Sequence, residues 1–181
     1  MPWFQSLNLD YAFWVTIFAI FILLLLSAFF SGSETALTKA SRGKLQTQAD
    51  KGSRSAARAL SITEDNERLI GSVLLGNNLV NILATSLATA LFTKLVGESS
   101  VALATLVMTV LVLIFAEVLP KTYAITNAER AAARVSAPIS LLVSIFDPIV
   151  SAIRKLVRGI LWLFGVRTSA DEPILAVREE I

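Results

Sequence analysis

The chain alternates long apolar blocks with shorter polar segments. Residues 11–30 contain no charged side chain, and the apolar blocks at 69–96 and 101–119 are interrupted by few polar residues. Twenty helical residues rise about 30 Å, which matches the hydrocarbon thickness of a bilayer. The pattern therefore predicts three membrane-spanning helices over about 11–30, 69–96 and 101–119.

The segment 39–68 separates the first two blocks and has a different character. It carries seven Lys or Arg and four Asp or Glu residues among many Ala, Leu, Gln and Ser. This composition favours a helical arm that lies in water or among the lipid headgroups.

Residues 135–166 are apolar but are divided by Asp147 and Pro148 into pieces too short to cross a membrane. The second piece places apolar residues at helical spacing and Arg154, Lys155 and Arg158 on the other side. A basic amphipathic helix of this kind lies in the interface, and three cations in a fourth span would be costly. We expect an interfacial helical hairpin over 135–166, with a fourth spanning helix as the alternative.

The predicted fold is thus an all-α membrane protein with three transmembrane helices and amphipathic juxtamembrane helices on the cytoplasmic side. Residues 1–134 form the three-helix domain, and the polar segment 167–181 reads as the start of a linker to a further cytosolic domain. Lys and Arg residues follow the first and third spans and are absent from residues 1–10. The positive-inside rule then places the N-terminus outside and the C-terminus in the cytoplasm. We expect the protein to lie in the plasma membrane.

Composition narrows the chemistry further. The chain is 55% hydrophobic, with no cysteine and no histidine, and its mean hydropathy is +0.68. Zinc and copper would lack their usual ligands, and disulfides are excluded. Any bound metal would be a hard cation held by oxygen. We expect no nucleic-acid partner and no enzymatic activity.

Polar residues of the three spans converge in depth. At 1.5 Å per residue, Ser27 and Ser31 lie about 24 and 30 Å from the outer side, and Glu117 about 24 Å. Asn77 and Asn81 lie about 12–18 Å from the inner end of the second span. All three helices therefore place oxygen atoms in the cytoplasmic half of the membrane.

Helical geometry divides the asparagines. Asn77 and Asn81 share a face, whereas Asn78 points roughly 100° away, so the three need not serve one site. Gly32 and Gly76 permit close approach of the backbone.

The third span carries the most informative residue. Glu117 is a carboxylate inside a span, which indicates an ion or proton role. Pro120 has no N–H to donate and so frees the carbonyl of Ala116 beside Glu117. Lys121, one turn on, offers a salt bridge as the structural alternative.

Hydroxyl, amide, backbone and carboxylate oxygens together suit Mg²⁺, and Na⁺ could use much of the same set. One carboxylate leaves a divalent ion undercompensated, so we expect weak binding with some water retained. Ser27 and Ser31 could instead pack helices closely, and the asparagines could be interhelical hydrogen-bonding residues. Glu34, after the first span, is expected to be a cap or an interfacial residue.

The segments "FFSGSETALTKASR", "LLGNNLVNI" and "AEVLPKTYA" occur in that order on the three spans. In these three segments the chain resembles the transmembrane domain of the CorC/CNNM family of magnesium transporters, and the resemblance covers residues 11–165. The resemblance implies a homodimer with three transmembrane helices per subunit and Mg²⁺ efflux driven by inward sodium. Cytosolic CBS domains that bind nucleotide would follow in a full-length chain. The resemblance implies a metal site of Ser27, Ser31, Gly76, Asn81 or its neighbour Asn78, and Glu117, with Lys121 nearby. The residues themselves add the Ala116 carbonyl as a ligand and Gly32 and Pro120 as supporting residues.

Two other functions remain open from the sequence. One is a Mg²⁺-sensing membrane module without transport, which needs the same site. The other is an intramembrane hydrolase in which Lys121 activates Ser27 or Ser31, a chemistry that requires nucleophile and base within hydrogen-bond reach.

Overall fold

The computed structural model describes residues 11–97 and 100–164, and throughout these ranges the chain forms helices joined by short turns, with no strand. The helices in chain order are α1 (Tyr11–Lys39), α2 (Arg42–Asp50), α3 (Arg54–Glu64), α4 (Asn66–Val96), α5 (Val101–Leu111), the π-helical segment η3 (Val112–Val118), α6 (Leu119–Thr126) and α7 (Ala128–Leu163). The expected all-α class is confirmed. The expected linker 167–181 lies outside the described residues.

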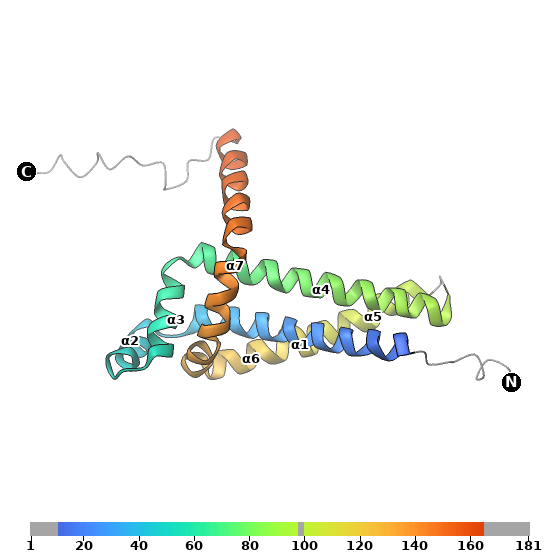
Figure 1. Cartoon of the computed structure of the whole chain (residues 1–181), viewed down its shortest axis with the longest axis horizontal. Coiled ribbons are helices and arrows are strands. Elements are labelled where there is room, and N and C mark those ends of the chain that lie inside the picture. Colours follow the sequence, from blue (N-terminus) through green and yellow to red (C-terminus); the bar gives the residue numbers. More distant parts are fainter. Residues whose placement is uncertain (1–10, 98–99, 165–181) are drawn as a thin grey trace, which may run out of the picture.

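Three long helices form a layer of roughly parallel rods. These are α1, α4 and the continuous helix Val101–Thr126, which α5, η3 and α6 build together (Figure 1). α2 and α3 lie at one end of the layer, and the last residues of α4 and the first residues of α5 lie at the other. The exposed faces of the rods are apolar, with Phe18 64% exposed and Leu106 63% exposed. Such faces are suited to contact lipid.

Four helices of the described chain are long and apolar enough to cross a membrane. Three of them are the rods, and α7 is the fourth. In Figure 1, however, α7 runs crosswise to the three rods. Its buried residues reach only to Val150, and the remainder exposes both apolar and basic side chains. This geometry suits an interfacial helix better than a fourth span alongside the other three.

The third rod does not end at Pro120, as the sequence suggested, but continues to Thr126. The reason is η3, where the chain switches to the wider π-helical pattern and the Leu119 N–H donates to the Ile114 carbonyl, five residues back. A π-helical turn shifts the hydrogen-bond register, so a proline without an N–H can follow without breaking the helix.

The first rod is also longer than its apolar block. α1 continues through Glu34 to Lys39, so the "SGSE" segment is helix interior and Glu34 caps nothing. The polar arm is helical, as expected, and consists of α2 and α3. Ser53 caps α3 by accepting a hydrogen bond from the Ala56 amide.

The predicted hairpin at 135–166 is wrong, because α7 is one helix of 36 residues with Pro138 and Pro148 inside it. A proline inside a helix removes one hydrogen bond and favours a bend, but it does not force a reversal of the chain. α7 packs instead against α1, α3 and α4, and its buried residues lie between Ala128 and Val150.

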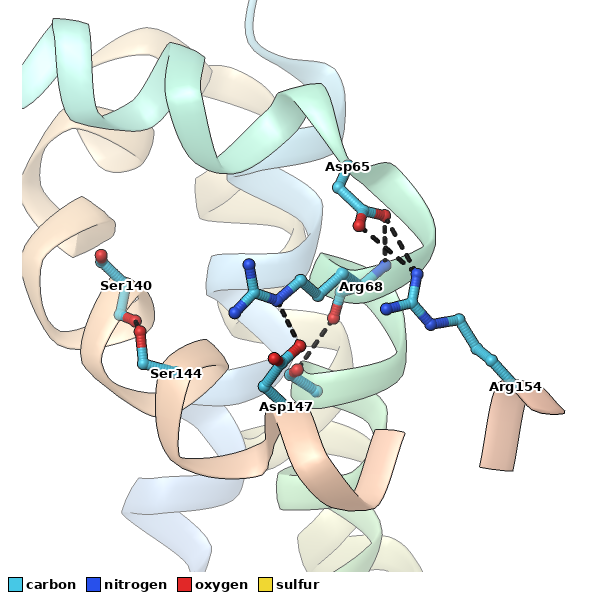
Figure 2. A network of polar contacts seen from close by, with 7 residues as sticks. Asp65, Arg68, Ser140, Ser144, Asp147 and Arg154 are labelled. Atoms are coloured by element: carbon cyan, nitrogen blue, oxygen red, sulfur yellow. Dashed lines mark hydrogen bonds and ion pairs between the residues drawn. The ribbon is translucent and has the colours of Figure 1, made fainter. Parts of the chain in front are cut away.

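Two ion pairs fasten the middle of α7 to the beginning of α4 (Figure 2). Arg68 pairs with Asp147, and Arg154 approaches Asp65 to 3.3 Å between Nη1 and Oδ2. Asp65 also caps α4 by accepting from the Arg68 amide at 2.9 Å. This hydrogen bond, followed by the charge of Arg154, lowers the pKa of Asp65 despite an opposing effect of desolvation. We call the four residues the α4–α7 clamp.

Candidate functional site

The polar residues of the three rods meet in one hydrogen-bonded cluster. Ser27 of α1 donates from Oγ to Oδ1 of Asn77 on α4 at 2.8 Å, and Asn77 donates from Nδ2 to Oε1 of Glu117 at 3.1 Å. Ser31 donates from Oγ to Oε2 of Glu117 at 2.9 Å. Residues up to 86 positions apart in sequence are thereby brought together.

Lys121 completes the cluster. Its Nζ lies 3.0 Å from Oε2 of Glu117, one turn along the same helix. Glu117 therefore receives hydrogen bonds on both oxygens, from an amide, a hydroxyl and an ammonium group. An acceptor on both oxygens is what an ionised carboxylate provides. Ser27 and Ser31 are fully buried, whereas the side chains of Glu117 and Lys121 are 25% and 42% exposed.

Close helix packing positions these groups. A Cβ built on Gly76 would lie 2.6 Å from the ring of Phe30, which is itself only 5% exposed. A Cβ on Gly32 would lie 3.3 Å from Cβ of Pro120. Both glycines thus allow α1 to approach its neighbours closely, as their sequence positions suggested.

The asparagines separate as the helical geometry requires. Asn77 joins the cluster, and Asn78 is exposed on another face of α4. Asn77 rather than Asn78 is therefore the amide that lies with the serines and Glu117. Of the two neighbours, only Asn77 shares a hydrogen bond with the cluster, and it lies on the same face of α4 as Asn81.

Asn81 lies one turn beyond Asn77 and lines a groove together with Glu117. Its Oδ1 is buried and has no hydrogen-bond partner among the described residues. Ala116 is fully buried in η3, directly before Glu117. The sequence did not predict the π-helical segment η3. The only sequence signal near it was Pro120, which indicated an irregular helix.

The cluster supplies oxygen ligands of the hard type. Each serine donates its proton within the cluster and retains lone pairs, and Asn77 and Asn81 add amide oxygens. Within residues 11–97 and 100–164, no three His, Cys, Asp or Glu side chains gather in a way that could hold a metal. The arrangement is therefore suited to weak, exchangeable coordination of a hard cation around one carboxylate.

The fold and the cluster define a class: a multi-pass, all-α membrane protein with a polar centre built from three helices. Within that class, the family model "Cyclin M transmembrane N-terminal domain" (CNNM) matches residues 18–181, and the chain belongs to this family.

Two curated bacterial proteins are similar to parts of the chain. The UPF0053 inner membrane protein YfjD of Escherichia coli (strain K12) is 49% identical over 61 residues, which cover 34% of this chain and 14% of that protein. A UPF0053 protein of Haemophilus influenzae is 40% identical over 72 residues, which cover 39% of this chain and 17% of the relative. The matched segment is thus a small part of each relative's length.

Proposed function

We propose that the chain is the membrane domain of a magnesium transporter in which Glu117 and its partners bind the transported ion. The observation that supports this most directly is the meeting of oxygen ligands from three helices at a single intramembrane carboxylate. Ionisable groups inside a membrane are costly and are typical of ion pathways. Membership of the CNNM family also supports a role in ion transport.

In this proposal, Glu117 supplies the charge and Ser27, Ser31 and Asn77 supply neutral oxygens. Asn81 and the Ala116 carbonyl are candidates for further ligands, with water completing the shell. Mg²⁺ prefers near-octahedral oxygen coordination and gives up its water reluctantly, so partial hydration suits it.

Lys121 would alternate with the ion. Its ammonium neutralises Glu117 in the structure at 3.0 Å. An arriving Mg²⁺ would displace it, and its return would help the ion to leave. The site then never presents an uncompensated carboxylate to the membrane interior.

We further propose efflux of Mg²⁺ coupled to inward Na⁺, in a homodimer within the plasma membrane. The positive charge of the α2–α3 arm and of the chain after Pro120 supports a cytoplasmic location for these parts. Nucleotide-binding CBS domains are expected as cytosolic partners of this domain in the longer protein.

The intramembrane hydrolase is not favoured by the geometry. Ser31 donates its hydroxyl proton to Glu117, and Ser27 donates its own to Asn77. Within the described residues, neither serine bonds to Lys121. Lys121 instead pairs with Glu117 at 3.0 Å, so nucleophile and base are not in hydrogen-bond contact as this chemistry requires.

The test is Mg²⁺ flux in vesicles that contain the purified protein and a trapped Mg²⁺-sensitive dye. Glu117→Gln keeps the shape of the side chain and removes its charge, and we expect it to abolish flux. Glu67→Gln serves as the matched control, because Glu67 is exposed in the first turn of α4. Circular dichroism and gel filtration check that both variants are folded.

Normal flux by Glu117→Gln would refute the proposal. Saturable Mg²⁺ binding by the wild-type protein without any flux would identify a sensing module instead.

A further inference from the structure

A groove leads away from Glu117 between α4 and the third rod. It has a volume of about 300 Å³ and is lined by Asn81 and Thr85 of α4, Thr105, Met108 and Thr109 of α5, and Val112, Leu113 and Glu117 of η3. Since a water molecule occupies about 30 Å³ of liquid, the groove has room for several.

The polar lining is concentrated in two facing rows. Asn81 and Thr85 are one turn apart on α4, and Thr105 and Thr109 are one turn apart on α5. With Glu117, five of the eight lining residues carry a side-chain oxygen.

The threonines are oriented to accept rather than to donate. Thr85, Thr105 and Thr109 each give their hydroxyl proton to the carbonyl four residues back, at 2.8, 2.9 and 2.7 Å. Such back-bonding is common in membrane helices, and it leaves lone pairs as the available part of each oxygen. The amide of Asn81, whose Oδ1 is buried and unpartnered within the described part of the chain, lies beside this row. Acceptors suit a cation or its hydrating water.

The groove also has the necessary length and direction. Thr105 precedes Glu117 by twelve residues, or about 18 Å of helix, and lies about 6 Å from the beginning of α5. That end of α5 is opposite to α2 and α3 (Figure 1). The rows therefore extend from the cluster toward the face of the protein that the positive-inside rule assigns to the exterior.

We infer that the α4–α5 groove is a hydrated passage through which a divalent cation moves between Glu117 and the exterior, an inference that rests on the proposed function. Its threonine and asparagine oxygens replace part of the bulk water around the partly hydrated ion, without adding a charge that would trap it. The ion is therefore held less strongly by the neutral oxygens of the groove than by the carboxylate of Glu117.

Cysteine labelling tests the hydration of the groove directly, since the chain has no cysteine of its own. Thr105→Cys and Thr109→Cys place single thiols in the groove. Leu106→Cys and Val110→Cys are matched controls on the same helix, because these residues are 63% and 46% exposed but do not line the groove. The reagent is a cationic, membrane-impermeant methanethiosulfonate added outside reconstituted vesicles.

Thiolate is the reactive form and requires water, so a thiol in lipid reacts poorly. We expect the two groove variants to react at least tenfold faster than the two controls. Equal rates at all four positions, whether fast or slow, would overturn the inference.

Transport supplies a second measurement. Thr109→Val preserves shape and removes the hydroxyl, and we expect Mg²⁺ flux to fall several-fold while Mg²⁺ binding in detergent changes less than twofold. Thr122→Val is the control, because Thr122 is exposed on α6 and makes the same kind of back-bond outside the groove. Unchanged flux in Thr109→Val would contradict a passage along this row. Labelled groove thiols together with normal flux in Glu117→Gln would instead reject the proposed function and leave the hydrated groove standing.

Discussion

Replacing Gly76 by alanine tests the packing that builds the candidate site. The new Cβ would lie 2.6 Å from Cε1 and Cζ of Phe30, about 1 Å closer than the roughly 3.5–4.0 Å at which carbon atoms attract best. Phe30 is 5% exposed and belongs to the main core cluster, so its ring has little space into which to move. The ring must displace neighbours, or α1 and α4 must separate.

Overpacking of this size costs about 1–3 kcal/mol. A glycine-to-alanine change also favours a helix by up to about 1 kcal/mol, and this gain must be measured separately. Gly159→Ala measures it, because a Cβ at Gly159 in α7 meets nothing within 4 Å. We expect the free energy of unfolding of Gly76→Ala to lie about 1–3 kcal/mol below that of Gly159→Ala, by the overpacking term alone.

The assay is SDS-induced unfolding in mild detergent followed by circular dichroism. Phe30→Leu in the Gly76→Ala background should recover part of the loss, with a coupling of about 0.5–3 kcal/mol as residues in contact show. Equal stability of Gly76→Ala and Gly159→Ala, or no coupling to Phe30, would refute the claim that this contact sets the α1–α4 distance.

Two further predictions concern charge. Lys121→Met should tighten Mg²⁺ binding several-fold by removing the cation that competes for Glu117, whereas Lys94→Met, at the far end of α4, should leave the affinity unchanged in isothermal titration calorimetry. Because the pKa of Asp65 is lowered from 3.8 in the folded protein, its capping contribution is present above that pH and is lost as the pH falls through the folded value. Hydrogen exchange of the Arg68 amide, corrected for intrinsic rate, should accelerate in that acid range in the wild type but not in Asp65→Asn, and equal acid sensitivity in both would reject the capping role.

The sequence predicts the depth of the site residues in the membrane well, but it predicts poorly which way each helix is rotated about its axis. Depth along each helix depends only on residue count and rise, and this count placed Ser27 level with Glu117 and Ser31 within about one turn of it. The structure joins Ser31 and Glu117 by a hydrogen bond of 2.9 Å. The rotation of each helix about its axis depends instead on its neighbours. The choice between Asn77 and Asn78 is such a rotation, and contacts such as that of Gly76 with Phe30 determine it.

The helix ends predicted at two prolines were wrong. Pro120 and Pro148 both suggested breaks, yet each lies within a continuous helix. Before Pro120, the π-helical pattern of η3 adjusts the hydrogen-bond register. Around Pro148, the α4–α7 clamp and the packing of Val150 hold the helix in place. Tertiary contacts of this kind outweigh a local preference worth about 3 kcal/mol.

In the proposed function, the placement of Lys121 accounts for a site in which one carboxylate both binds and releases an ion. A divalent cation held by several carboxylates would leave slowly, and a lone carboxylate left empty in the membrane would be costly. Lys121 lies one turn from Glu117 on the same helix, so it can exchange with the ion by rotation of its own side chain. In the proposed cycle, Lys121 neutralises Glu117 when the ion is absent, and the bound divalent ion keeps an excess positive charge that favours its release.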